Sequence, residues 1–187
     1  MALMSRRALM ALVTCLSTQP SLAQQTPANV SVTAPLDSQY VGDLTALHDK
    51  VLALANAIPP DKYSWRPSND VRTIAQVLTH IAGEWFVLCP RSVAARPPSD
   101  FGAPGEAMRK LEEITTKAEV IAQLTKSWVY CSSVLSRIDP RKLIPDSLPA
   151  RMSFQRVVLL VSGDQHEHLG QLIAYARSVG VTPPWSK

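Results

Sequence analysis

The chain has 187 residues, which is enough for one domain with a short extension. Hydrophobic residues make up 46% and charged residues 18%, and this composition excludes an intrinsically disordered protein. The net charge of +4 is not gathered into a basic block, so we expect no nucleic-acid partner. With 6% aromatic residues and 7 glycines, the composition favours an all-α protein over one rich in sheet.

Residues 1–23 have the pattern of a secretory signal peptide. Arg6 and Arg7 precede an apolar stretch over residues 8–16, and residues 21–23 form a small-residue cleavage site. The apolar stretch is shorter than the ~20 residues that span a bilayer, so we expect no stable membrane anchor. Cleavage after Ala23 would release a periplasmic or secreted protein.

A polar tail over residues 24–36 separates the signal peptide from a domain that we place at residues 37–187. Apolar residues then recur every three or four positions from Tyr40 to Ile58, which predicts the first helix. A second apolar stripe runs from Ile74 to Leu88, with Asn69 and Asp70 as expected helix caps.

Proline and glycine are frequent over residues 96–106, so we expect the segment 90–116 to be a long connection that allows a crossover. A third helix is predicted from Lys117 to Ile138, and a fourth from about Ser153 to the stop at Gly180. Four helices with such connections predict a four-helix bundle with long crossover connections.

Two cysteines, Cys89 and Cys131, remain after the predicted cleavage, because Cys15 lies in the signal peptide. An even number of cysteines in an oxidising compartment is consistent with one disulfide. Two buried free thiols are the alternative. The sequence leaves both open.

Two pairs of histidine and carboxylate side chains are spaced by one helical turn. His80 and Glu84 lie on the predicted second helix, and Asp164 and His168 lie on the fourth. Such pairs on facing helices assemble metal sites in bundles, but they also form buried polar networks. His166 is two residues from His168, so we expect it to face solvent. His48 is expected at the boundary of the core.

Residues 65–85 and 163–186, WRPSNDVRTIAQVLTHIAGEW and GDQHEHLGQLIAYARSVGVTPPWS, resemble the two signature segments of the DinB-like superfamily of four-helix bundles. The resemblance implies that His80 and His168 are metal ligands, the latter just before Gly170-Gln171. The third ligand, usually histidine in the family, corresponds to Asp164. Aspartate also binds zinc or nickel, so the expected cofactor is one of these divalent metals.

The resemblance also implies a function, since characterised members include metal-dependent hydrolases and thiol-dependent transferases. Hydrolysis of a small molecule of unknown identity fits an exported protein better, because reduced low-molecular-weight thiols are scarcer outside the cytosol. In this hypothesis Glu84 is the catalytic base or a partner of the ligands. A noncatalytic binding module is the alternative. We also expect a homodimer, because bundles of this family commonly pair through their helices. In addition, Trp85, Trp128 and Trp185 give more aromatic surface than one small bundle needs.

Overall fold

The computed structural model describes residues 36–93, 95–139 and 154–186. These residues form five α-helices and three short 3-10 helices and contain no strand. The α-helices are α1 (Leu36–Ala57), α2 (Ile74–Val87), α3 (Pro104–Glu112), α4 (Lys117–Leu135) and α5 (Phe154–Ser178). The predicted signal peptide and the expected start of the last helix at Ser153 lie outside the described residues.

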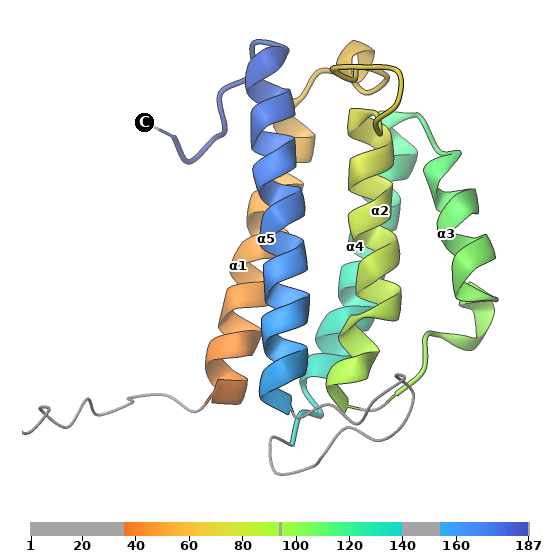
Figure 1. The fold of residues 1–187 in the computed structure, drawn as a ribbon, viewed down its shortest axis with the longest axis vertical. Helices are drawn as coiled ribbons and strands as arrows, with labels where there is room; N and C mark the ends of the chain where they lie inside the picture. The colour runs from red at the N-terminus through yellow and green to blue at the C-terminus, as the bar shows by residue number, and fades with distance from the viewer. Residues whose placement is uncertain (1–35, 94, 140–153, 187) are drawn as a thin grey trace, which may run out of the picture. The chain divides into compact units, whose positions relative to one another are not determined.

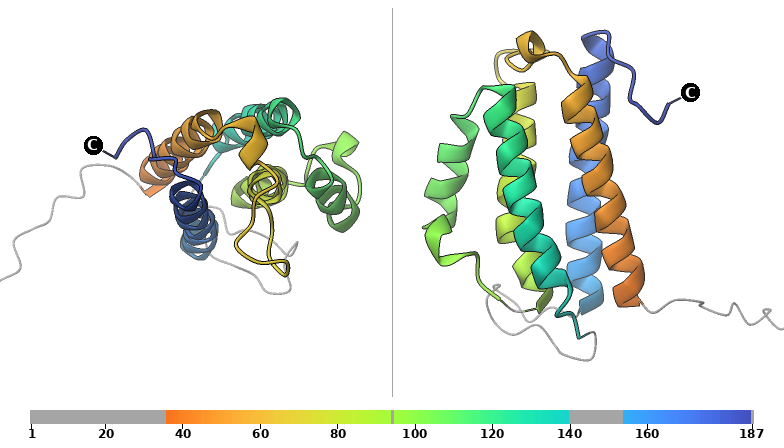
Figure 2. Two further views of the ribbon diagram at one scale, coloured as in Figure 1. Left: turned by 90° about the horizontal axis from the view of Figure 1, so that it is seen from above. Right: turned by 180° about the vertical axis from the view of Figure 1, so that it is seen from behind.

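Helices α1, α2, α4 and α5 form a four-helix bundle (Figures 1 and 2). Helix α2 packs against α4 and α5, and α1 packs against the same two helices. The colour gradient in Figure 1 shows that α1 and α5 run in one direction and α2 and α4 in the other. The prediction of an all-α bundle with crossover connections is therefore confirmed.

Helix α3 provides the crossover between α2 and α4. Because α2 and α4 are parallel neighbours, the chain must return along the bundle between them, and α3 makes this return while it packs on the outside of α2 (Figure 2). We predicted a long connection here, and the structure shows that it contains a helix of 9 residues, which the sequence analysis did not predict. Pro104 occupies the first helical turn, where its missing N–H costs nothing, so the helix forms after the Pro- and Gly-rich segment ends.

The ends of α2 and α5 are set by specific capping residues. Thr73, not Asn69 or Asp70, caps α2, in a reciprocal capping box with Gln76. At the end of α5, Gly180 adopts a φ of 80°, which permits the N–H of Val181 to reach the Ala176 carbonyl at 2.8 Å. The predicted stop at Gly180 is confirmed.

The core of the bundle combines aliphatic and aromatic side chains and includes a disulfide between Cys89 and Cys131, whose Cα atoms are 5.4 Å apart. Trp85 is 1% exposed and Trp128 packs against the core, so only Trp185 of the three tryptophans is exposed. The tryptophan argument for a homodimer is weaker as a result, and the dimer stays a prediction. None of the helices in the described ranges is both long and apolar enough to cross a membrane.

His48 lies inside the bundle, so its predicted place at the boundary of the core is wrong. Its imidazole is stacked on Trp128 with ring centroids 4.4 Å apart, and it lies 5.1 Å from the ring of Trp85. The residue is 6% exposed, and its Nδ1 atom has no hydrogen-bond partner among the described residues. Burial lowers the pKa of His48, because the charged imidazolium is poorly solvated there.

Candidate metal centre

Helices α2 and α5 bring His80, Glu84 and His168 together. Glu84 Oε1 lies 3.0 Å from His80 Nε2 and 3.3 Å from His168 Nε2. The two imidazole rings are 5.1 Å apart and nearly perpendicular. Exposed fractions of the three side chains lie between 11% and 16%, so the cluster is mostly shielded from solvent but remains accessible.

This donor set fits a divalent metal. Two imidazole nitrogens and one carboxylate oxygen are the ligands of many catalytic zinc sites, with one further position open. Bonds of ~2.0 to 2.1 Å in tetrahedral geometry would place the ligand atoms about 3.3 to 3.4 Å apart. The separations of 3.0 and 3.3 Å are close to these values, and all three ligand atoms lie within 4.8 Å of one another.

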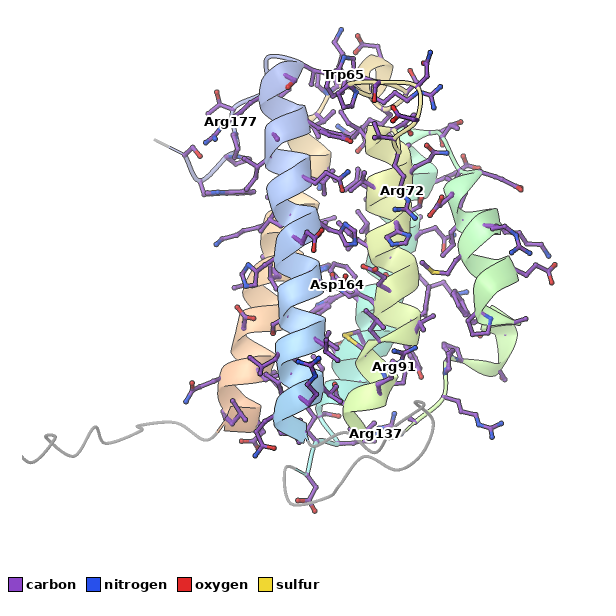
Figure 3. All side chains as sticks on the ribbon, in the orientation of Figure 1. Trp65, Arg72, Arg91, Arg137, Asp164 and Arg177 are labelled. Carbon is purple, nitrogen blue, oxygen red and sulfur yellow. A yellow bond between two sulfur atoms is a disulfide. The ribbon has the colours of Figure 1, made fainter. Side chains whose placement is uncertain are left out.

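Asp164 lies at the edge of the cluster. Its Oδ1 atom is 3.9 Å from His168 Nε2, and its side chain is 38% exposed (Figure 3). Burial and the neighbouring Glu84 charge raise the pKa of the Asp164 carboxyl to about 6. Of the four predicted site residues, the structure therefore brings His80, Glu84 and His168 closest together, and Asp164 lies beside them.

Glu84 carries the negative charge at the centre of the cluster. Burial raises the pKa of its carboxyl, but the hydrogen bonds with His168 and His80 outweigh burial and hold it at about 2. The hydrogen bond between Glu84 and His168 also raises the pKa of His168. The Nε2 atom of Gln165 donates to Glu84 Oε2 at 2.8 Å, which leaves Oε1 to face both imidazoles.

The second ring nitrogen of each imidazole, Nδ1, also has a polar partner that orients the ring. Glu112, at the end of α3, lies with its Oε1 atom 2.9 Å from His80 Nδ1 and accepts a hydrogen bond from Arg72 Nε at 3.0 Å. Gln171 Oε1 lies 3.5 Å from His168 Nδ1. A carboxylate on the far nitrogen fixes the ring and its tautomer, so that Nε2 of His80 is directed to the cluster.

A cavity of about 320 Å³ lies beside the cluster, between α2 and α5. Glu84 and Asp164 line one part of it, and its other lining residues are Leu88, Arg91, Val157, Leu160 and Val161. A cavity of this size accommodates a small molecule. The cluster therefore combines metal-type ligands with space for a ligand.

The four-residue spacing of His80 with Glu84 and of Asp164 with His168 predicted that both histidines point into one site. His166 is exposed and pairs with Asp43 at 3.1 Å, as its offset from His168 predicted. The sequence did not indicate Glu112, because the helix that carries it was not predicted. Apolar Met108 and Leu111 one turn apart, after Pro104, were the available signal.

Comparisons with known proteins agree with this fold. None of the curated proteins compared with the chain matches it. The crystal structure of the DinB-like protein YjoA from Bacillus subtilis matches with a TM-score of 0.60 and 16% identity, over 77% of this chain and 93% of that one. This match shows the fold. The family model of the DinB superfamily matches residues 43–172, which is more than half of the chain and includes all four site residues. The chain therefore belongs to the DinB superfamily.

Proposed function

We propose that the protein is an exported, metal-dependent hydrolase of a small molecule. The observation that supports this proposal most is the approach of His80 Nε2 and His168 Nε2 to Glu84 Oε1 beside a cavity. A divalent ion such as zinc or nickel, held by these three residues, would supply Lewis acidity that activates water at neutral pH.

In this proposal Glu84 is a metal ligand and Asp164 is the general base. Oε1 of Glu84 is the atom that both imidazoles approach, whereas Asp164 is more exposed and lines the cavity. In hydrolysis, the oxygen of water forms a bond to the substrate while the bond to the leaving group breaks. The Asp164 carboxylate would accept one proton from that water and return it to the leaving group.

Metal binding is tested by isothermal titration of the chelator-treated full chain with Zn²⁺ and with Ni²⁺. We expect one ion per chain and loss of this binding in His168→Ala and in Glu84→Gln. His166→Ala is the matched control, because this exposed histidine is two residues away and contacts Asp43 instead. Equal binding by the His168→Ala variant, with circular dichroism showing an intact fold, would overturn the site.

The catalytic role is tested separately with Asp164→Asn. We expect this variant to bind metal within ~10-fold of the wild type, because Asp164 lies outside the three closest ligands. It should lose hydrolysis of any ester, amide or phosphoester that the wild type cleaves. Loss of metal binding in Asp164→Asn would instead make Asp164 a ligand, as the family resemblance implied.

A noncatalytic binding module is the second candidate. The observation that favours it is that Glu84 already satisfies both imidazoles by hydrogen bonds within the protein. Failure of both metals to bind the wild type would support this role.

Export is supported by the N-terminal pattern and by the disulfide between Cys89 and Cys131, since disulfides persist in oxidising compartments. Mass spectrometry of the protein from its host should find a mature N-terminus at Gln24. Recovery of the intact Met1 terminus from the cytosol would contradict export.

A further inference from the structure

The cavity beside the metal centre has different chemistry at its two ends. On α2 and the turn that follows it, Glu84 and Arg91 are seven residues apart, which is about 10 Å along a helix. Glu84 and Asp164 line the cavity at the metal centre, and in Figure 3 Arg91 lies closer than Asp164 to the end of α2. The guanidinium group of Arg91 is the basic group among the lining residues.

The wall between these ends is apolar. On α5, Val157, Leu160, Val161 and Asp164 follow the spacing that places side chains on one face of a helix, and all four line the cavity. Val157 and Val161 are each 2% exposed. Leu160 is 41% exposed, which leaves a large apolar side chain in water beside the cavity. An apolar ligand would cover it.

Arg91 is half-buried and has no ion pair or side-chain hydrogen bond with another residue in the described part of the chain. A guanidinium group beside apolar side chains binds a carboxylate or phosphate through charge-assisted hydrogen bonds. The negative charges of Glu84 and Asp164 would repel an anion from the other end. The cavity thus has a preferred orientation for a ligand with one anionic end.

We infer that the substrate is a small amphipathic anion, whose anionic group binds Arg91, whose apolar segment lies along α5, and whose hydrolysable group reaches the metal centre. The inference rests on the proposed function for the reacting end only. The anionic and apolar contacts come from residues that do not belong to the metal centre. Binding at Arg91 is therefore measurable without metal.

The test is isothermal titration of the metal-free full chain with straight-chain carboxylates from butanoate to decanoate and with the matched primary alcohols. We expect affinity to rise with chain length as the apolar wall is covered. Each carboxylate should bind at least ~10-fold more tightly than its alcohol. Arg91→Met should abolish this preference, and Arg91→Lys should retain part of it because the charge is kept.

Arg177→Met is the matched control, because Arg177 lies near the other end of α5, away from the cavity (Figure 3). An unchanged preference in Arg91→Met, or no carboxylate binding by the wild type, would overturn the inference. In either case stoichiometric metal binding by the wild type would leave the proposed metal centre intact. Conversely, carboxylate binding without metal binding would contradict the proposed hydrolase and support the anion site at Arg91.

Discussion

Reduction of the disulfide between Cys89 and Cys131 should lower the stability of the protein substantially. The bridge joins the turn after α2 to α4 across 42 residues of sequence, and the closed loop contains α3. A crosslink restricts the unfolded chain more than the folded one, by an entropy that grows with the logarithm of the loop length. For a loop of this length the chain-entropy relation gives about 4 kcal/mol at 25 °C.

The assays are urea unfolding and thermal unfolding of the full chain, both followed by circular dichroism at neutral pH with and without reductant. We expect the free energy of unfolding to fall by about 4 kcal/mol on reduction, and the melting temperature to fall by roughly 8 to 16 °C for a domain of this size. The double variant Cys89→Ala/Cys131→Ala is the control, since its stability should not respond to reductant.

Two results would refute this reasoning. The first is a difference below ~1 kcal/mol between the oxidised and reduced proteins, because the bridge would then not restrict the unfolded chain as the loop length requires. The second is titration of two free thiols in the unfolded, non-reduced protein from its host, because the cysteines would then not be paired. The second result would also remove one support for export.

Three further perturbations test how the site and the core are held. Glu112→Gln should weaken metal binding ~10- to 100-fold, because Glu112 orients the metal ligand His80. Glu113→Gln is the control, since Glu113 is the exposed neighbour and its substitution should leave metal binding unchanged. Equal effects of the two substitutions would contradict this role of Glu112. Gly83→Val should weaken metal binding in the same way. A Cβ at Gly83 would overlap the end of the Met108 side chain, and the branched valine would also press on Leu111, so we expect α3 to move away from α2. Unchanged affinity would show that α3 is not needed. His48→Phe should remove part of the acid sensitivity of folding. The pKa of His48 is below 6.5 in the folded protein, so its contribution to stability is complete above about pH 6.5 and falls with decreasing pH, by at most ~1.4 kcal/mol per unit. Identical pH profiles of unfolding for the variant and the wild type would contradict it.

The homodimer remains a prediction and is checked by light scattering at micromolar concentration. A mass near twice 20.4 kDa is expected for the full chain, somewhat less for each subunit after cleavage of the signal peptide. A monomer mass would contradict the prediction.

The bundle was predictable because its signal is local. Apolar residues every three or four positions predict a helix, and proline and glycine indicate where helices end, as Gly180 does for α5. The caps were less predictable. Asn69, Asp70 and Thr73 are all suitable N-cap residues, and only Thr73 stands three residues before a glutamine that can complete a capping box.

The two site histidines were predictable for a similar reason, but which of the two carboxylates lies between the imidazoles was not. Spacing by four residues places Glu84 with His80 and Asp164 with His168 on the same helix faces. The geometry of the pair of helices then decides which carboxylate lies between the imidazoles. Glu84 Oε1 is within 3.3 Å of both imidazoles, whereas Asp164 is 3.9 Å from His168. This difference depends on how α2 and α5 rotate against each other, which one sequence does not contain.

Helix α3 shows how a connection becomes part of a site. Gly83 on α2 has no side chain, and this absence allows Met108 and Leu111 to pack directly on the α2 backbone. That contact holds α3 close enough for Glu112, on its last turn, to reach His80. Sequence periodicity describes each helix alone, so it could not relate a glycine on α2 to a carboxylate on α3. If this relation holds, Gly83→Val and Glu112→Gln should weaken metal binding by similar factors, and the double variant should be little worse than either alone, because both remove the same hydrogen bond.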